Sequence, residues 1–531
     1  MNMSNTTRTP EQNKALYAIE TIVCFALEHS LIKQEDVDYS RNILMELFQF
    51  SEPFLDRVDY KHEESPQAII DVLIDYGYQI GLIPENSDTY RDLLDAKIMG
   101  FLMARPSDVI AEFETISEEH GIAAATDFFY KLSIDSNYIR MDRVAKNVYW
   151  KQETAYGDIE MTINLSKPEK NPKEIAMAKL LPPPIYPKCQ LCRENVGYAG
   201  RINHPARQNL RIIPLEMNEE PWYFQYSPYV YYNEHCIVFH RDHVPMKLTK
   251  DTLRRLLSFV DVVPHYFIGS NADLPIVGGS ILTHDHFQGG RHTFPIQNAP
   301  KELIFTHKDY PGVTVSIVKW PMSVLRITSQ DSEVLLESAN NIYEIWQQYS
   351  DVEADVLAFT KDESGENVRH NTVTPIVHRT EDGAYEMDLV LRNNRTNEQF
   401  PDGIFHPHSE MHHIKKENIG LIEVMGLAIL PGRLKNELDL VAHILSGDDR
   451  LHSASIAGEV PELTQHLDWI KELIDEHGNQ FSKDEAVQLV QHEVGDKFVE
   501  ILGHAGVYKR TEVGQQAFVR FLEHMGYNIQ A

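Results

Sequence analysis

The chain has 531 residues, of which 42% are hydrophobic and 24% charged, so it is long enough for more than one domain and is not disordered as a whole. Its formal net charge of −30 argues against a nucleic-acid partner, because binding to a phosphate backbone needs clustered Lys and Arg. An anionic small molecule would need a local basic patch.

Neither a membrane segment nor a signal peptide is expected. No apolar stretch approaches the roughly 20 residues that span a bilayer, and the polar N-terminal segment 1–8 lacks the apolar region of a signal peptide. We therefore expect a cytoplasmic protein that does not bind membranes. The chain has four cysteines, too few for a disulfide framework.

The first 165 residues are predicted to form a helical N-terminal region. Apolar residues recur with helical spacing in Ala15–Leu27, and Ser65-Pro66 opens a second apolar run that reaches Ile80. Asp88 precedes another such run, and Pro106 suits the first turn of a helix. This region contains no evident catalytic constellation.

A proline-rich and lysine-rich stretch from Leu165 to Pro187 predicts a domain boundary. It contains Pro168, Pro172 and the run Pro182–Pro184. Proline is excluded from helix interiors and central strands because it lacks the amide N–H. The next domain is therefore expected to begin at about residue 186.

Cys189 and Cys192 form a Cys-x-x-Cys pair directly after this boundary. Alone, such a pair is redox-active, one half of a metal site, or incidental. A redox role requires a thioredoxin-like βαβ context, which the surrounding sequence lacks, so we favour a metal. The remaining ligands must come from elsewhere in the chain. The segment 233–246 offers four candidates: His235, Cys236, His240 and His243.

Three arginines supply cations between the cysteine pair and that segment. Arg201, Arg207 and Arg211 stand in an otherwise acidic chain. The guanidinium group matches phosphate oxygens in a bidentate way, so one or more of them are candidates for gripping a phosphorylated ligand. For any single one, a surface arginine paired with a nearby acid is an equally good interpretation.

The stretch 276–290 leads from an apolar run into three chemically capable side chains. If Ile281–Gln288 is a β-strand, its period of two places His284, His286 and Gln288 on one face. The preceding Gly278, Gly279 and Ser280 let the backbone approach a ligand closely and offer N–H groups to an anion.

A histidine is a suitable nucleophile toward phosphorus, since its ordinary pKa of about 6.5 leaves a free lone pair at neutral pH. A bare His-x-His is more often a pair of surface or metal-binding residues. The flanking glycines and Gln288 favour catalysis by His286.

The pattern Gly-Gly-Ser-x-x-x-His-x-His-x-Gln resembles the active-site segment of the galactose-1-phosphate uridylyltransferase family, a branch of the histidine-triad superfamily. The usual form is His-Pro-His-x-Gln, and Asp285 departs from it. This change and the long helical flanks resemble the second bacterial class of the family. The resemblance implies an α+β fold with two histidine-triad-like antiparallel-sheet halves and helices, flanked by N-terminal and C-terminal helical regions.

The resemblance also implies a structural zinc ion. His243 resembles the third zinc ligand of the family and His284 would be the fourth, completing a Cys₂His₂ set with Cys189 and Cys192. A closed set of four protein ligands is structural rather than catalytic. Zinc would then hold His284 and, through the strand, orient His286.

A second metal is an open question. Relatives of the first class hold one with a Glu and three His. His406 and His408, in a second His-x-His pattern, are candidates for such a site. The remaining ligands cannot be aligned.

The second half is predicted to contain strands, followed by C-terminal helices. Strands are expected at Val313–Val318, Ser323–Thr328 and Met387–Arg392, a helix at Ser332–Tyr349 and an apolar helix at Gly420–Leu430. The final helices are expected at Leu434–Leu445, Pro461–Glu476, Lys483–Leu502 and Val513–Met525. Ser482 is the expected N-cap of the third, and Gly478 the expected terminator of the second. The predicted domains are therefore 1–165, 186–300, 301–430 and 431–531.

The function implied by the resemblance is that of a UDP-glucose:hexose-1-phosphate uridylyltransferase in galactose catabolism. His286 attacks UDP-glucose, and galactose 1-phosphate then accepts the uridylyl group. Gln288 donates to the phosphoryl oxygens, Gly278, Gly279 and Ser280 add further donors, and the arginines grip the diphosphate. We expect a homodimer.

We compare this function with three alternatives. A histidine-triad hydrolase usually carries His at the position of Gln288, and an amide cannot exchange protons at neutral pH. A dinucleoside polyphosphate adenylyl or phosphorolytic transferase also uses Gln, and base preference would separate it from a uridylyltransferase. In a non-enzymatic zinc-binding scaffold, the cysteines and histidines would only stabilise the fold.

Overall fold

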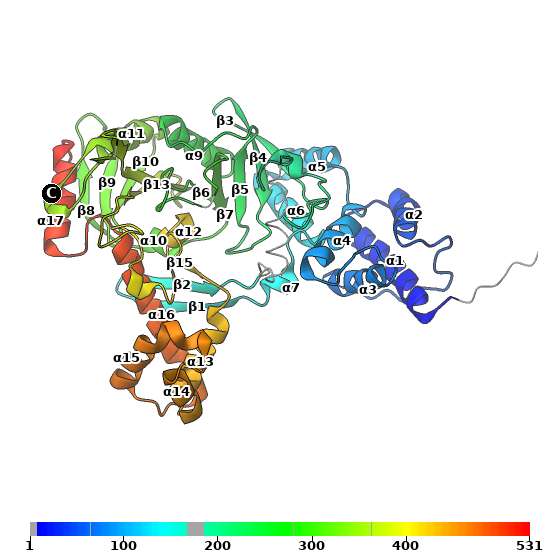
Figure 1. The fold of residues 1–531 in the computed structure, drawn as a ribbon. Coiled ribbons are helices and arrows are strands. Elements are labelled where there is room, and N and C mark those ends of the chain that lie inside the picture. The colour runs from blue at the N-terminus through cyan, green and yellow to red at the C-terminus, as the bar shows by residue number, and fades with distance from the viewer. Residues whose placement is uncertain (1–7, 64, 167–184, 280, 363, 531) are drawn as a thin grey trace, which may run out of the picture. The chain divides into compact units, whose positions relative to one another are not determined.

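The computed structural model describes residues 8–63, 65–166, 185–279, 281–362 and 364–530 (Figure 1). The chain divides into two compact units. Unit 1 comprises residues 1–146, 166–230 and 234–244, and unit 2 comprises residues 147–165, 231–233 and 245–531. Most of the predicted proline-rich boundary and Ser280 lie outside the described residues. No helix in the described ranges is long and apolar enough to cross a membrane.

The predicted N-terminal region is helical as far as Val144, but residues 148–163 at its end form two strands that belong to unit 2. The helices of this region are α1 (Pro10–Glu28), α2 (Val37–Leu47), α3 (Gln67–Gln79), α4 (Asp88–Gly100), α5 (Pro106–His120), α6 (Ile122–Asp135) and α7 (Met141–Val144). Helix α1 begins in a capping box in which the Thr9 hydroxyl accepts from the Gln12 amide and the Gln12 side chain accepts from the Thr9 amide. Pro106 occupies the first turn of α5, as predicted.

Unit 1 also contains an antiparallel meander of β3 (Ile213–Met217), β4 (Glu220–Tyr226) and β5 (Cys236–His240). Asn218 and Glu219 form the two-residue turn between β3 and β4, and both have positive φ, as a hairpin of this length favours. Tyr226 is fully buried, and its hydroxyl donates to the Thr126 carbonyl of α6. Trp222, Phe224 and Tyr226 of β4 are therefore part of the core of unit 1.

Unit 2 is built on a run of antiparallel strands. In spatial order they are β16 (Asn528–Ile529), β8 (Lys301–Thr306), β9 (Thr314–Val318), β10 (Val324–Ser329), β14 (Tyr385–Asn393), β13 (Asn371–Arg379), β6 (Phe267–Gly269) and β7 (His286–Gly290). Helices α9 (Lys250–Val262) and α11 (Ser332–Gln348) pack on this run. Strands β13 and β14 are almost wholly buried, so they form its centre.

One of the C-terminal helices of unit 2 packs on a smaller sheet. Strands β1 (Val148–Thr154) and β2 (Gly157–Ile163) form a hairpin, and β15 (Leu427–Leu430) pairs with β2 in parallel. Helix α16 contacts β1, where the Trp150 indole N–H donates to the Gln491 carbonyl at 3.3 Å. The helices are α13 (Leu434–Leu445), α14 (Asp449–Ile456), α15 (Leu467–His477), α16 (Lys483–Ala505) and α17 (Glu512–His524).

The predicted ends of these helices are confirmed. Ser482 caps α16 in a capping box with Glu485. Gly478 ends α15 with φ of +83°. Together with the antiparallel sheet of unit 2, these helices confirm the α+β fold class.

One predicted helix is wrong. The segment Gly420–Leu430 forms a single turn, α12 (Leu421–Val424), and then strand β15. Gly426 separates them with φ of +100°, which is incompatible with a continuing helix. A side chain there would also meet Pro295 and Trp320, because its Cβ would lie 2.9 Å from an atom of each. Apolar composition alone did not distinguish a buried strand from a buried helix.

Candidate active site

The turn that carries Cys189 and Cys192 is held by a buried asparagine. The Asn195 side-chain amide donates to the Cys189 and Cys192 carbonyls at 2.9 and 2.7 Å. Its oxygen accepts from Nε2 of His204 at 2.7 Å. Burial, followed by the charges of Arg207 and Arg201, lowers the pKa of His204 to about 4, so the ring is neutral at neutral pH. Asn195 and His204 were not singled out from the sequence, since neither stands in a recognisable motif.

The thiols and His243 lie close together. The Sγ atom of Cys192 is 3.5 Å from Sγ of Cys189 and 3.3 Å from Nδ1 of His243. The hydrogen bond with Cys192, together with burial, raises the pKa of the Cys189 thiol. A bound cation would reverse this effect, because coordination favours the thiolate.

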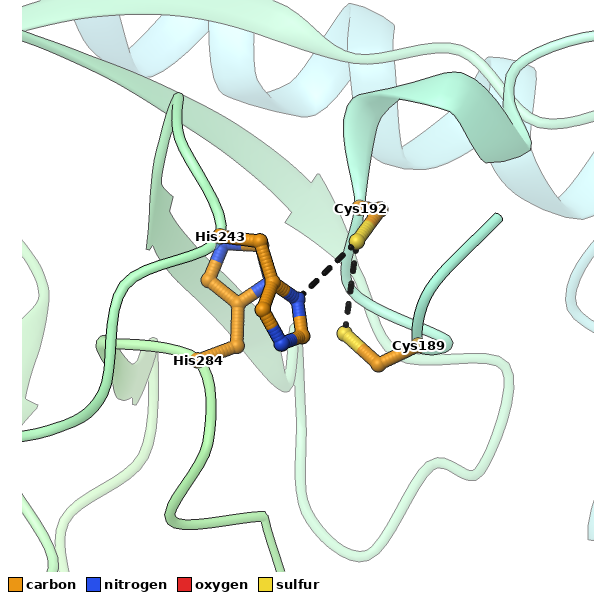
Figure 2. A group of neighbouring side chains, drawn as sticks. All are labelled: Cys189, Cys192, His243 and His284. Carbon is orange, nitrogen blue, oxygen red and sulfur yellow. Dashed lines mark hydrogen bonds between the residues drawn. The ribbon is translucent and has the colours of Figure 1, made fainter. Parts of the chain in front are cut away.

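One ligand atom from each of Cys189, Cys192, His243 and His284 lies within 4.8 Å of the others (Figure 2). Two sulfur and two imidazole ligands form a set that suits tetrahedral zinc. The rival ligands His235, Cys236 and His240 do not belong to this group among the described residues. His235 instead bonds through Nδ1 with the Tyr229 carbonyl, and Nδ1 of His240 accepts from the Asp242 amide.

The strand that carries His286 is shorter than predicted. Residues 282–284 form a turn, and β7 begins at His286 rather than at Ile281. The alternation of side chains along a strand therefore places His286 and Gln288 on one face of β7, whereas His284 lies before the strand. Phe287, on the opposite face, is fully buried and belongs to the core. Opposite Gln288 in the ladder stands Gly269 of β6.

The ring of His286 is oriented by a backbone carbonyl two residues earlier in the chain. Its Nδ1 lies 2.8 Å from the His284 carbonyl oxygen. A carbonyl oxygen can only accept, so Nδ1 carries the proton and Nε2 carries the lone pair. Burial lowers the pKa of His286 to about 4. The ring is therefore neutral at neutral pH, with the lone pair of Nε2 on the side opposite the carbonyl.

The space around Gly278 and Gly279 has no room for a Cβ atom. A Cβ on Gly278 would lie 2.5 Å from the Ala272 carbonyl oxygen, and one on Gly279 would lie 2.6 Å from the Asn271 side-chain nitrogen. The Asn418 amide donates to the Gly278 carbonyl at 3.4 Å. Close to these glycines, Ile276 has φ of +73°, an unfavourable conformation for a β-branched residue. Such conformations concentrate at ligand-binding segments.

The three predicted arginines have different environments. In Arg201, Nε and Nη2 are buried without a hydrogen-bond partner. Arg207 lies over the Tyr138 ring at 5.5 Å. Arg211 is buried, and its guanidinium group donates to the Ala104 carbonyl at 3.0 and 2.7 Å and also to the Gln208 and Leu210 carbonyls. Burial lowers the pKa of Arg211 to about 10, which leaves it charged. Of the three, Arg201 best fits an anion ligand, since buried donors of a cation require acceptors.

The second His-x-His pattern divides between two environments. His406 bonds through Nε2 with the Asn418 side-chain oxygen at 3.3 Å. His408 forms a possible metal-binding group with Glu410 and His504. The rings of His408 and His504 are stacked at 4.0 Å. Neither Glu410 nor His504 was singled out from the sequence, because His504 lies almost a hundred residues away on α16.

Two protein-family models match the chain. The model described as "Galactose-1-phosphate uridyl transferase, N-terminal domain" matches residues 31–245, and the one described as "Galactose-1-phosphate uridyl transferase, C-terminal domain" matches residues 259–456. The two matches together cover most of the chain.

Curated relatives match over nearly the full length. A galactose-1-phosphate uridylyltransferase from Caldanaerobacter subterraneus subsp. tengcongensis is 54% identical over 516 residues, which cover 97% of this chain and 99% of that protein. Those from Halalkalibacterium halodurans and Bacillus subtilis are 50% and 49% identical, and the matches cover 96% of this chain and 99% and 97% of those proteins. No solved structure matches the chain significantly.

Proposed function

Because the chain belongs to the galactose-1-phosphate uridylyltransferase family, we propose that it transfers a uridylyl group from UDP-glucose to galactose 1-phosphate. The observation that carries the proposal is the environment of His286, a neutral buried imidazole whose Nδ1 is bonded to a carbonyl and whose Nε2 bears the lone pair. Such a ring attacks phosphorus without the help of a separate base.

The proposed reaction has two displacements at one phosphorus atom. In the first, Nε2 of His286 bonds to the α-phosphorus of UDP-glucose, and the bond to the bridging oxygen breaks, releasing glucose 1-phosphate. In the second, a phosphate oxygen of galactose 1-phosphate attacks, the phosphorus–nitrogen bond breaks, and UDP-galactose leaves. The Nδ1 proton stays on the ring throughout, and the His284 carbonyl stabilises the positive charge of the uridylylated imidazole.

Charge on the phosphoryl oxygens would be stabilised by neutral and cationic donors. We assign the Gln288 amide to the non-bridging oxygens, because Gln288 follows His286 on the same face of β7. The backbone at Gly278 and Gly279, with Ser280, would add donors. Arg201 would grip the diphosphate, and its unsatisfied Nε and Nη2 support this role. Arg207 is the second candidate, whereas the carbonyl contacts of Arg211 favour a supporting role behind the other two.

The ligands Cys189, Cys192, His243 and His284 would hold a zinc ion. The donor set supports zinc, and a closed set of four protein ligands leaves no position for substrate. The ion would supply no chemistry to the transfer itself. By fixing His284, the four ligands would hold the carbonyl that orients His286.

A labelling experiment tests the proposed function. The protein is incubated with UDP-glucose labelled in the uridine, and the reaction is quenched. We expect label on the protein, its loss when galactose 1-phosphate is added, and no labelling of a His286→Gly variant. Label that never reaches the protein would overturn the mechanism. Labelling from an adenine dinucleotide in preference to UDP-glucose would favour the dinucleoside polyphosphate transferase, and no activity with either would favour the scaffold.

We also infer a cytoplasmic homodimer that uses only small-molecule substrates. The acidic composition and the family membership support this inference. Light scattering of the purified protein measures its mass in solution. A mass of one chain would contradict the dimer.

A further inference from the structure

A third group of potential metal ligands lies in the helical part of unit 1, away in sequence from the cysteine pair. Glu28 is the last residue of α1, His29 follows it as the C-cap, and His62 lies in the segment before α3. One ligand atom from each lies within 4.8 Å of the others. We propose that Glu28, His29 and His62 bind a divalent transition-metal ion, with zinc as the natural choice.

The Glu28 carboxylate is already fixed in place. Its Oε1 lies 2.9 Å from Nδ1 of His62, and its Oε2 accepts from the Tyr60 hydroxyl at 2.5 Å. The rings of His29 and His62 are nearly parallel, with an interplanar angle of 8° and centroids 5.8 Å apart. Three potential ligands from two segments are thus held together before any ion binds, which lowers the entropy cost of binding.

The ring of His29 lies between two hydrogen-bond acceptors. Its Nδ1 lies 3.3 Å from Oδ1 of Asp135, and its Nε2 lies 3.0 Å from the Glu63 carbonyl oxygen. Both partners are acceptors, whereas a neutral imidazole has only one N–H. One ring nitrogen would therefore turn its lone pair toward an oxygen, unless a second proton or a metal ion is bound there.

A metal ion suits this geometry better than a second proton. The His29 side chain is only 8% exposed, so an imidazolium would be a largely buried charge. Asp135 is buried as well, and it also pairs with Lys131. Binding of the ion through Nε2 would need the proton on Nδ1, where Asp135 can accept it, and a shift of the Glu63 carbonyl away from Nε2. This carboxylate–histidine arrangement is the usual support of a metal-binding imidazole.

The donor set identifies the class of ion. Two imidazoles and one carboxylate suit zinc, cobalt or nickel, whereas calcium and magnesium prefer oxygen ligands only. His62 is 62% exposed and Glu28 is 39% exposed. Water can therefore reach the ion and complete its coordination. The ion would join the end of α1 to the segment before α3 and stabilise that part of unit 1 against local unfolding.

The test compares zinc content in matched variants after equilibration with zinc and removal of the free ion. His62→Gln removes a ligand that is mostly exposed, so the variant should fold. His120→Gln, on the exposed end of α5, is the control. A Cys189→Ser, Cys192→Ser double variant removes the thiolate group. We expect His62→Gln to bind one zinc ion fewer than wild type, His120→Gln to match wild type, and the double variant to keep the additional ion.

Cobalt distinguishes the two sites in the same proteins. Cobalt bound by thiolates absorbs strongly in the near ultraviolet, whereas cobalt bound by imidazole and carboxylate absorbs only weakly in the visible range. We expect the weak bands to persist in the double variant and to lose intensity when His62→Gln is added, with any remaining bands coming from the group of His408, Glu410 and His504. Equal zinc content in wild type and His62→Gln would overturn the proposal. The proposed uridylyl transfer would stand in either case, because it uses none of these residues.

Discussion

At the scale of single residues, one hydrogen bond determines which nitrogen of His286 is free. The His284 carbonyl accepts from Nδ1, and this leaves the lone pair on Nε2. This hydrogen bond thus connects His284, a candidate metal ligand, to His286, the candidate nucleophile two residues later in the chain. The residue-scale predictions concern the nucleophile, the donor beside it and the arginine with buried unsatisfied donors.

Replacement of the nucleophile should abolish turnover without loss of metal. We expect His286→Gly to lower kcat by a factor on the order of 10⁶, the size of effect seen when a nucleophile is removed. Zinc content and melting temperature should stay close to those of the wild type. Turnover within about tenfold of the wild type would show that another group attacks phosphorus.

Loss of the amide donor should slow the reaction without weakening substrate binding. We expect Gln288→Ala to lower kcat by about 10²–10³, with KM for UDP-glucose nearly unchanged, because the donor acts mainly on charge that develops in the transition state. Steady-state kinetics measure both constants. A rise in KM alone would instead assign Gln288 to ground-state binding.

Loss of the Arg201 guanidinium should weaken nucleotide binding. A hydrogen bond to a charged group contributes about 1.5–3 kcal/mol, so we expect Arg201→Ala to raise KM for UDP-glucose by about 10- to 150-fold. Arg254→Ala is the control, since Arg254 lies on α9 and pairs with Asp251 on the same helix. Equal KM values in the two variants would remove Arg201 from the site.

At the scale of elements, a buried chain of polar groups joins the segment after the second His-x-His pattern to α13 and α15. Nε2 of His466 donates to Glu437 at 2.9 Å, so Nδ1 of His466 must accept from Nδ1 of His413, which lies 2.9 Å away. Arg433 donates to both Glu437 and the His413 carbonyl. Burial lowers the pKa of both His413 and His466, so both imidazoles are neutral at neutral pH.

The lowered pKa of His413 predicts that the stability of the folded protein depends on pH. Burial, then the charges of His466, Lys497 and Arg433, lowers the pKa of His413 to about 3. The unfolded chain, with a pKa of about 6.5, binds this proton first as the pH falls. The stabilisation from His413 is therefore complete above about pH 6.5 and is lost progressively toward pH 3.

A matched pair of variants isolates the contribution of His413. In His413→Asn the amide replaces the Nδ1 donor but does not titrate. We expect its melting temperature to fall less between pH 7 and pH 5 than that of the wild type, while the control His120→Gln keeps the wild-type slope. Parallel curves for wild type and His413→Asn would show that the titration of His413 does not contribute in this range.

At the scale of the whole molecule, the four candidate zinc ligands come from segments almost a hundred residues apart, Cys189 to His284. An ion that joins such distant segments stabilises the folded state strongly, because its binding free energy is available only after folding. We expect a strong chelator to lower the melting temperature and to reduce uridylylation, and zinc to restore both. The Cys189→Ser, Cys192→Ser variant should not respond to the chelator. An unchanged wild type after complete zinc removal would exclude a structural role.

The sequence by itself determined the local features of this protein. Helices α1, α3, α13, α16 and α17 were predicted near their observed bounds, and so were the starts of α4 and α5, because capping residues, prolines and apolar periodicity act within a few turns of chain. The same holds for Gly478 and Ser482 as helix ends. The four candidate metal ligands and the candidate nucleophile His286 were predicted from motifs and from resemblance, since each motif is short and contiguous.

Only the tertiary structure decided the features that depend on distant contacts. The strand start at His286 and the conversion of Gly420–Leu430 into a turn and a strand depend on which neighbours each segment packs against. No short stretch of sequence predicts that Arg201 and Arg211 have different surroundings. Nor does one predict that the ring of His408 stacks on that of His504. The same applies to the group around His29. Side chains far apart in the chain meet through packing, and packing is a property of the whole fold rather than of any short segment.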